Sequence, residues 1–106
     1  MHRIEPPVSR ALILVCEKCG KRLDSDSEKN PSRRLVSRLK KMAKKSFGRG
    51  EIRAVATSCM DVCPEGEVSV ALVGPGLRGA HADTRFFTVA VDDPDETARE
   101  ILETLK

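Results

Sequence analysis

The sequence RALILVCEKC, residues 10–19, decides more about the fold than any other stretch of the chain. Its first six residues are almost all apolar, and a short continuous apolar run is typical of a strand that is covered on both faces. Cys16 and Cys19 follow this run directly as a C-x2-C pair. We therefore expect a buried strand over residues 10–15 that leads straight into two cysteines.

A helix and a second strand are predicted next. Residues 21–30 are polar and are expected to form a loop, after which Pro31 can occupy the first turn of a helix, where a missing N–H is tolerated. From Leu35 onward apolar residues recur at helical spacing, and glycines close the helix. Residues 51–57 alternate as a strand does, and Cys59 follows them.

The predicted strand–helix–strand unit places the cysteines. Such a unit normally makes two parallel neighbouring strands joined by a right-handed crossover, so both strands end at the same edge of the sheet. Cys16 and Cys19 follow the first strand, and Cys59 and Cys63 follow the second. All four thiols are therefore expected at one end of the molecule.

The remainder of the chain completes a four-stranded mixed sheet. Strands are predicted over residues 68–73 and 86–91, with a loop rich in glycine between them. Asp93 suits the N-cap of a last helix, with Pro94 in its first turn and Glu96 placed for a capping box. The predicted order is β-α-β-β-β-α, which is an α/β fold.

Length and composition favour one small domain. The chain has 106 residues, of which 40% are apolar, and its net charge is +3. We expect a loose lead-in over residues 1–9 and a single domain over residues 10–106. The apolar run at residues 11–15 is too short for a signal peptide or a membrane span, so the expected location is the cytoplasm. Structural disulfides are rare there, and four cysteines then favour metal binding or redox chemistry.

The cysteine spacing is compatible with two metal centres. A [2Fe–2S] cluster takes four protein ligands, two for each iron, and one cysteine pair per iron meets that demand. A structural zinc site also accepts four thiolates. The C-x3-C pair at Cys59 and Cys63, and its distance from Cys16 and Cys19, differ from the usual zinc-ribbon pattern. The ligand types alone leave iron and zinc open.

The stretch TSCMDVCPEG, residues 57–66, resembles the second cysteine motif of thioredoxin-like [2Fe–2S] ferredoxins. That family includes small free-standing ferredoxins and ferredoxin-like subunits of respiratory complex I and related hydrogenases. The strand that runs into Cys16, and the acidic last helix, are also similar to the family. The first pair departs from it, because Cys16 and Cys19 are separated by fewer residues than in many members.

This resemblance implies a thioredoxin-like fold, a [2Fe–2S] cluster and a role in electron transfer rather than catalysis. It also implies that a homodimer can form. The residues that would hold the cluster are Cys16, Cys19, Cys59 and Cys63.

The cysteines also allow three other interpretations. They can be buried small hydrophobic residues or an incidental disulfide, or the ligands of a zinc-binding interaction module. Cys16 and Cys19 can instead form the C-x-x-C site of a thiol–disulfide oxidoreductase. In such enzymes the second cysteine lies in the first turn of a helix, whereas the helical pattern here is expected to begin about a dozen residues later. That interpretation also leaves Cys59 and Cys63 without a role.

The first predicted helix is strongly basic, and no acidic residue interrupts its cations. The simplest interpretation is a solvated face. A face of one sign lacks the ion pairs that such faces often carry, so docking to an acidic redox partner is the functional alternative. Scarce aromatic residues and the low net charge argue against nucleic acid as the partner. The cations are Arg33, Arg34, Arg38, Lys40, Lys41, Lys44 and Lys45.

The remaining candidate residues give weaker indications of function. His2 and His81 are expected to be surface or loop histidines, because nothing in their spacing suggests ligation. Residues 74–79 (GPGLRG) look like a phosphate loop only superficially, because they lack the lysine and the helix that such a loop requires. No set of residues typical of a catalytic site stands out.

Overall fold

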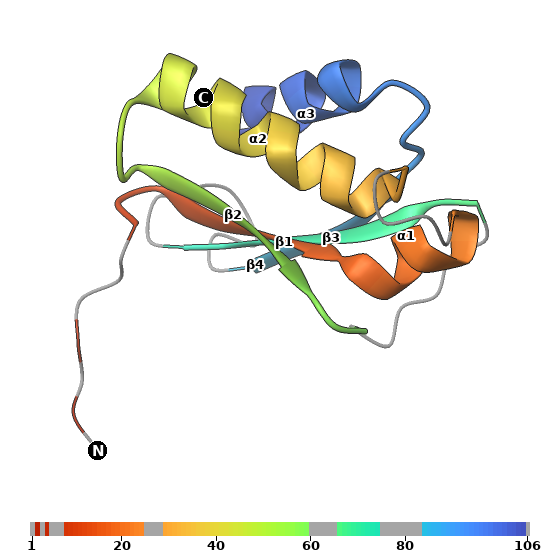
Figure 1. Ribbon diagram of the computed structural model, residues 1–106. Coiled ribbons are helices and arrows are strands. Elements are labelled where there is room, and N and C mark those ends of the chain that lie inside the picture. The colour runs from red at the N-terminus through yellow and green to blue at the C-terminus, as the bar shows by residue number, and fades with distance from the viewer. Residues whose placement is uncertain are drawn as a thin grey trace.

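A four-stranded sheet forms the central layer of the molecule, and two helices lie side by side over one of its faces (Figure 1). The computed structural model describes residues 2, 4, 8–24, 29–59, 66–74 and 84–105. In chain order the elements are β1 (Ala11–Cys16), α1 (Glu17–Leu23), α2 (Pro31–Phe47), β2 (Ile52–Thr57), β3 (Val68–Val73), β4 (Thr84–Val89) and α3 (Pro94–Glu103). The expected mixed α/β architecture is confirmed.

The strand order is β2-β1-β3-β4, with β1 in the interior of the sheet. β1 and β2 are parallel, whereas β3 is antiparallel to both β1 and β4. Ala11 lies opposite Ile52 at the start of the parallel pair, and Cys16 lies opposite Thr57 at its end. The two strands therefore finish level with each other, as the strand–helix–strand pattern predicts.

α2 crosses from the end of β1 back to the start of β2 and covers the sheet (Figure 1). Its N-cap is Asn30, whose side chain accepts hydrogen bonds from the backbone N–H groups of Ser32 and Arg33. Pro31 follows in the first turn, as expected. Gly48 ends the helix at φ 88°, a conformation that glycine adopts without steric cost.

The apolar face of α2 is the centre of the core. Leu35 and Leu39 are fully buried, and they belong to one cluster with Ile13 and Val15 of β1 and Leu72 of β3. Replacing a buried leucine of this kind by alanine costs about 2–5 kcal/mol. The packing of α2 on β1 and β2 therefore holds the strand ends, and the cysteines beside them, in place.

The bounds of β4 differ from the sequence-based expectation, whereas the start of α3 agrees with it. β4 covers Thr84–Val89 rather than residues 86–91. α3 begins as predicted, because Asp93 caps it through the N–H groups of Asp95 and Glu96. The Glu96 carboxylate accepts a hydrogen bond of 2.9 Å from Arg99, one turn further along the helix.

The prediction of a loop over residues 21–30 was wrong for its first part. α1 covers Glu17–Leu23 and continues directly from β1. Its C-terminal end is closed by a hydrogen bond from the Asp24 N–H to the Gly20 carbonyl, at 2.9 Å. The helix is short and contains a glycine, so its sequence pattern is weak, and contacts with α2 stabilise it instead.

Candidate metal centre

Cys16 and Cys19 form a buried pair where β1 passes into α1. Cys16 is the last residue of the strand and the N-cap of the helix, and Cys19 lies in the first turn. Cys16 is 0% exposed and Cys19 is 4% exposed. The sequence-based argument against a C-x-x-C redox site, that no helix begins at these cysteines, is therefore wrong.

Hydrogen-bond donors surround the sulfur of Cys19. Its Sγ lies 3.8 Å from Oγ of Ser69, a buried residue of β3. Burial has the largest single effect and raises the pKa of the Cys19 thiol. Hydrogen bonds from the Ser69 backbone N–H, the Cys16 thiol and the Ser69 hydroxyl outweigh it, so the pKa lies below its ordinary value. This environment stabilises a thiolate at Cys19.

The N-terminus of α2 anchors the turn that carries Cys16. Ser32 Oγ donates a hydrogen bond of 2.6 Å to the Cys16 carbonyl, and Ser32 is itself fully buried. Gly20 of α1 packs against the same place: a Cβ atom at Gly20 would clash with Asn30 and would lie 2.5 Å from Ser32 Oγ. Asn30 thus caps α2, and Ser32, two residues later, holds the cysteine turn.

Sequence reasoning did not identify Gly20, Asn30 or Ser32 as part of the site. The Asn-Pro-Ser sequence at residues 30–32 carries the signal of a helix N-terminus, but nothing in it indicates a contact with Cys16. That contact depends on how α1 folds back on α2.

An ion pair adds to the contact between α1 and α2. Arg33 donates to Glu17 Oε1 from Nη2 at 2.6 Å and from Nε at 2.9 Å. The hydrogen bond and charge of Arg33 hold the pKa of the Glu17 carboxyl below its ordinary value. The pair is partly exposed, so it orients the two helices more than it stabilises them.

Cys59 lies at the same edge of the sheet, two residues beyond the end of β2. It is exposed, and together with Glu17, Lys18, Lys21 and residues 56–58 it lines a cavity of about 430 Å³. A negative charge on Cys59 raises the pKa of Cys19, so the two thiols interact electrostatically. Cys59 and the buried pair of Cys16 and Cys19 thus lie at or just beyond the ends of strands that finish at the same edge of the sheet.

The described cysteines are not gathered into a complete site. Across residues 2, 4, 8–24, 29–59, 66–74 and 84–105, no three His, Cys, Asp or Glu side chains are placed so that they could hold a metal ion. Cys63 and His81 lie outside these residues, as does most of the glycine-rich stretch at residues 74–79. His2 is exposed, as expected.

The basic face of α2 does not have a single sign of charge in three dimensions. Arg33 pairs with Glu17 of α1, and Arg38 pairs with Asp95 of α3 at 3.0 Å. The expectation that this face lacks ion pairs was wrong, because the carboxylates come from other elements. The cations nearer the C-terminal end of α2, from Lys40 to Lys45, are exposed.

Comparisons with protein-family models, with curated proteins and with solved structures found no match for this chain. In the part of the chain that the structure describes, no helix has the length and apolar character needed to cross a membrane.

Proposed function

We propose that this chain is a small electron-transfer protein of thioredoxin-like fold that carries a [2Fe–2S] cluster on Cys16, Cys19, Cys59 and Cys63. The observation that supports it most is the parallel pairing of β1 with β2, in which Cys16 lies opposite Thr57. Thiols that follow two parallel neighbouring strands share one edge of the sheet. The electrostatic interaction of Cys19 with Cys59 agrees with that placement.

The cysteine thiols at this edge are the type of ligand that such a cluster requires. Four thiolates are its usual ligands, and the cluster supplies one-electron redox chemistry when it is bound. The chain contributes a preformed, water-shielded pair at Cys16 and Cys19, since both are buried. The N–H and hydroxyl of Ser69 stabilise negative charge on the Cys19 sulfur. Hydrogen bonds of this kind tune the reduction potential of metal-bound thiolates.

Thiol–disulfide exchange at Cys16 and Cys19 is a second candidate function, and the position of Cys19 in the first turn of α1 favours it. Burial opposes it. Exchange begins when a thiolate attacks an accessible sulfur, but the two residues are only 0% and 4% exposed. The same burial suits ligands that are not released during function, which is why we place the cluster first.

The proposed redox partner is an acidic protein. α2 presents exposed cations, and complementary charge accelerates encounter between redox proteins. In this proposal the chain carries electrons for its partner and catalyses no reaction of its own. α2 begins beside the cysteine edge, where the Ser32 hydroxyl contacts Cys16, and its exposed cations from Lys40 to Lys45 extend away from that edge.

The test is metal analysis of protein purified without oxygen, followed by an absorption spectrum. About two irons and two acid-labile sulfides per chain are expected, with visible charge-transfer bands. Cys16→Ser, Cys19→Ser, Cys59→Ser and Cys63→Ser should each lose or strongly alter these bands. Ser58→Ala, an exposed neighbour of Cys59, is the matched control and should leave them unchanged.

Two results would replace this proposal by another. A colourless protein that holds one zinc per chain, even after reconstitution with iron and sulfide, is a zinc module, because zinc has no such bands. A metal-free protein whose Cys16 and Cys19 cycle between dithiol and disulfide and reduce a test disulfide is a thiol–disulfide oxidoreductase.

A further inference from the structure

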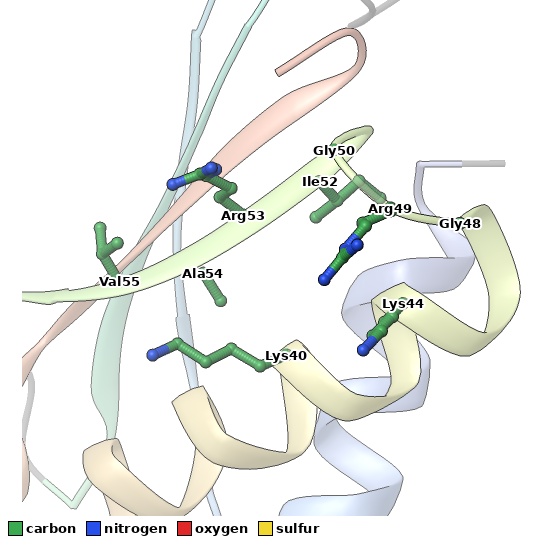
Figure 2. A pocket seen from close by; sticks show the side chains of 9 residues that line it. All are labelled: Lys40, Lys44, Gly48, Arg49, Gly50, Ile52, Arg53, Ala54 and Val55. Carbon is green, nitrogen blue, oxygen red and sulfur yellow. The ribbon is translucent and has the colours of Figure 1, made fainter. Parts of the chain in front are cut away.

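A cationic groove lies between the C-terminal half of α2 and the start of β2, on the opposite half of the molecule from α1 (Figure 2). Its volume is about 320 Å³. Figure 2 shows Lys40 and Lys44 reaching from the helix, Arg49 from the following turn and Arg53 from the strand. Ile52 and Ala54 supply apolar surface, and the glycines of the turn complete the wall.

The charge of this groove is not neutralised within the described part of the molecule. No aspartate or glutamate lines it, and Lys40, Lys44, Arg49 and Arg53 are all exposed. The ion pairs that α2 makes with other described residues involve Arg33 and Arg38, nearer its N-terminal end. Lys40 and Lys44 therefore bring positive charge of α2 that no acidic residue of the groove balances to a position beside β2.

β2 is an edge strand. It pairs with β1 on one side, and no described strand pairs with its other side. An edge strand presents outward N–H and C=O groups that can pair with another extended chain. Its side chains alternate between the two faces, so that Ile52 and Ala54 are buried while Arg53 and Val55 are exposed on the other face. An added strand would therefore meet Lys40 and Lys44 on one face and Arg53 on the other.

The edge of β2 also leads to the cysteines. Residues 52–55 line the cationic groove, and residues 56–59 line the cavity that contains Cys59. A six-residue strand such as β2 spans about 17 Å between its first and last Cα atoms. A segment that lies along β2 would thus extend from the groove to the edge where Cys16 and Cys19 lie.

We infer that the cationic groove docks an extended acidic segment of a partner protein, which adds to β2 as a fifth strand. Backbone hydrogen bonds to β2 provide the alignment, and carboxylates on alternate residues of the segment, which all point to one face of the sheet, pair with Lys40 and Lys44 on α2. The cations simultaneously reject basic or uncharged strands, which protects the edge from indiscriminate pairing. That the partner is a redox protein rests on the proposed function. The docking of the acidic segment itself does not require a bound cluster.

The experiment measures fluorescence anisotropy with a labelled ten-residue peptide of alternating glutamate and valine. The full chain carries either Lys40→Glu with Lys44→Glu, inside the groove, or Lys41→Glu with Lys45→Glu, outside it. All four residues are exposed on α2, and both pairs change the net charge equally. We expect the first pair to weaken binding about tenfold or more and the second by less than about threefold, because only the first faces the peptide.

A second probe tests the strand pairing. The same peptide with N-methyl groups on every backbone nitrogen keeps its charge but loses all of its N–H donors, including those that would face β2. It should bind at least about tenfold more weakly to the unmodified chain if the segment pairs with β2.

Several outcomes would overturn the inference. If binding of the peptide is undetectable, the cations only prevent other chains from pairing with the edge of β2. Equal losses for the two lysine pairs would indicate general attraction to α2, and equal binding of the N-methylated peptide would exclude a fifth strand. Tighter binding of a single-stranded oligonucleotide of equal charge, through Lys40 and Lys44, would make the groove a nucleic-acid surface. Peptide binding is measured whether or not the protein is coloured, so this inference and the cluster can fail separately.

Discussion

Gly20 occupies a position where the chain has no space for a side chain. Helix propensity alone favours alanine over glycine by about 1 kcal/mol. Here, however, a Cβ atom would clash with Asn30 and crowd Ser32, both of which are buried. Neither can move freely, because Asn30 caps α2 and Ser32 is hydrogen-bonded to the Cys16 carbonyl. The steric cost is therefore expected to exceed the gain in propensity.

Gly20→Ala should lower the free energy of unfolding by about 1–3 kcal/mol, as overpacking in a filled site does. Urea denaturation measures the change. Lys21→Ala is the matched control, since Lys21 is the next residue of α1 and is exposed. A Gly20→Ala protein as stable as the original would show that α1 is not held against α2 in the way described.

The elements differ in how well the sequence predicts them. α2 and the parallel pair of β1 and β2 were predicted correctly, because apolar periodicity and strong end signals agree with the tertiary contacts. α1 was missed because its seven residues, EKCGKRL, bury only Cys19 and Gly20 and show no apolar stripe. The carboxylates of Glu17 and Asp95 reach α2 from other elements, and a pattern read along one helix does not contain that information.

The N-cap of α3 was predicted from the sequence, and its contribution to stability can be tested. Asp93 accepts hydrogen bonds from the N–H groups of Asp95, at 3.1 Å, and Glu96, at 3.4 Å. Asp93→Ala should cost about 0.5–2 kcal/mol of unfolding free energy, because both N–H groups lose their acceptor. Asp93→Asn, which keeps an oxygen there, should cost much less. Asp92→Ala removes an exposed carboxylate one residue earlier and should change thermal unfolding little.

Across the whole molecule, residues that are distant in sequence must meet before the sheet is complete. Val73 of β3 and Thr84 of β4 pair across a short sequence separation. The partners of β1 lie much further along the chain, because Ala11 pairs with Ile52 and Leu12 pairs with Val73. The entropic cost of closing a loop rises with the length of the loop. The pairings of β1 therefore cost more conformational entropy than the pairing of β3 with β4. We expect the insertion of β1 between β2 and β3 to limit the folding rate.

Stopped-flow refolding checks this expectation. Ile13→Val and Ile101→Val each remove one methylene group from a buried position, which costs about 0.5–1.5 kcal/mol. Ile13→Val, in β1, should mainly slow folding, whereas Ile101→Val, in α3, should mainly accelerate unfolding. The reverse result would mean that α3 docks before β1 is inserted.

The interior position of β1 also matters while the protein is being synthesised. β1 leaves the ribosome before every other strand, yet both of its neighbours, β2 and β3, are made later. At about 5–20 residues per second, the interval between completing β1 and completing β3 is about 3–11 seconds. During that time the apolar strand and its two adjoining thiols have no sheet to enter. The nascent chain is therefore most exposed to aggregation and oxidation at a strand that ends up in the interior of the finished sheet.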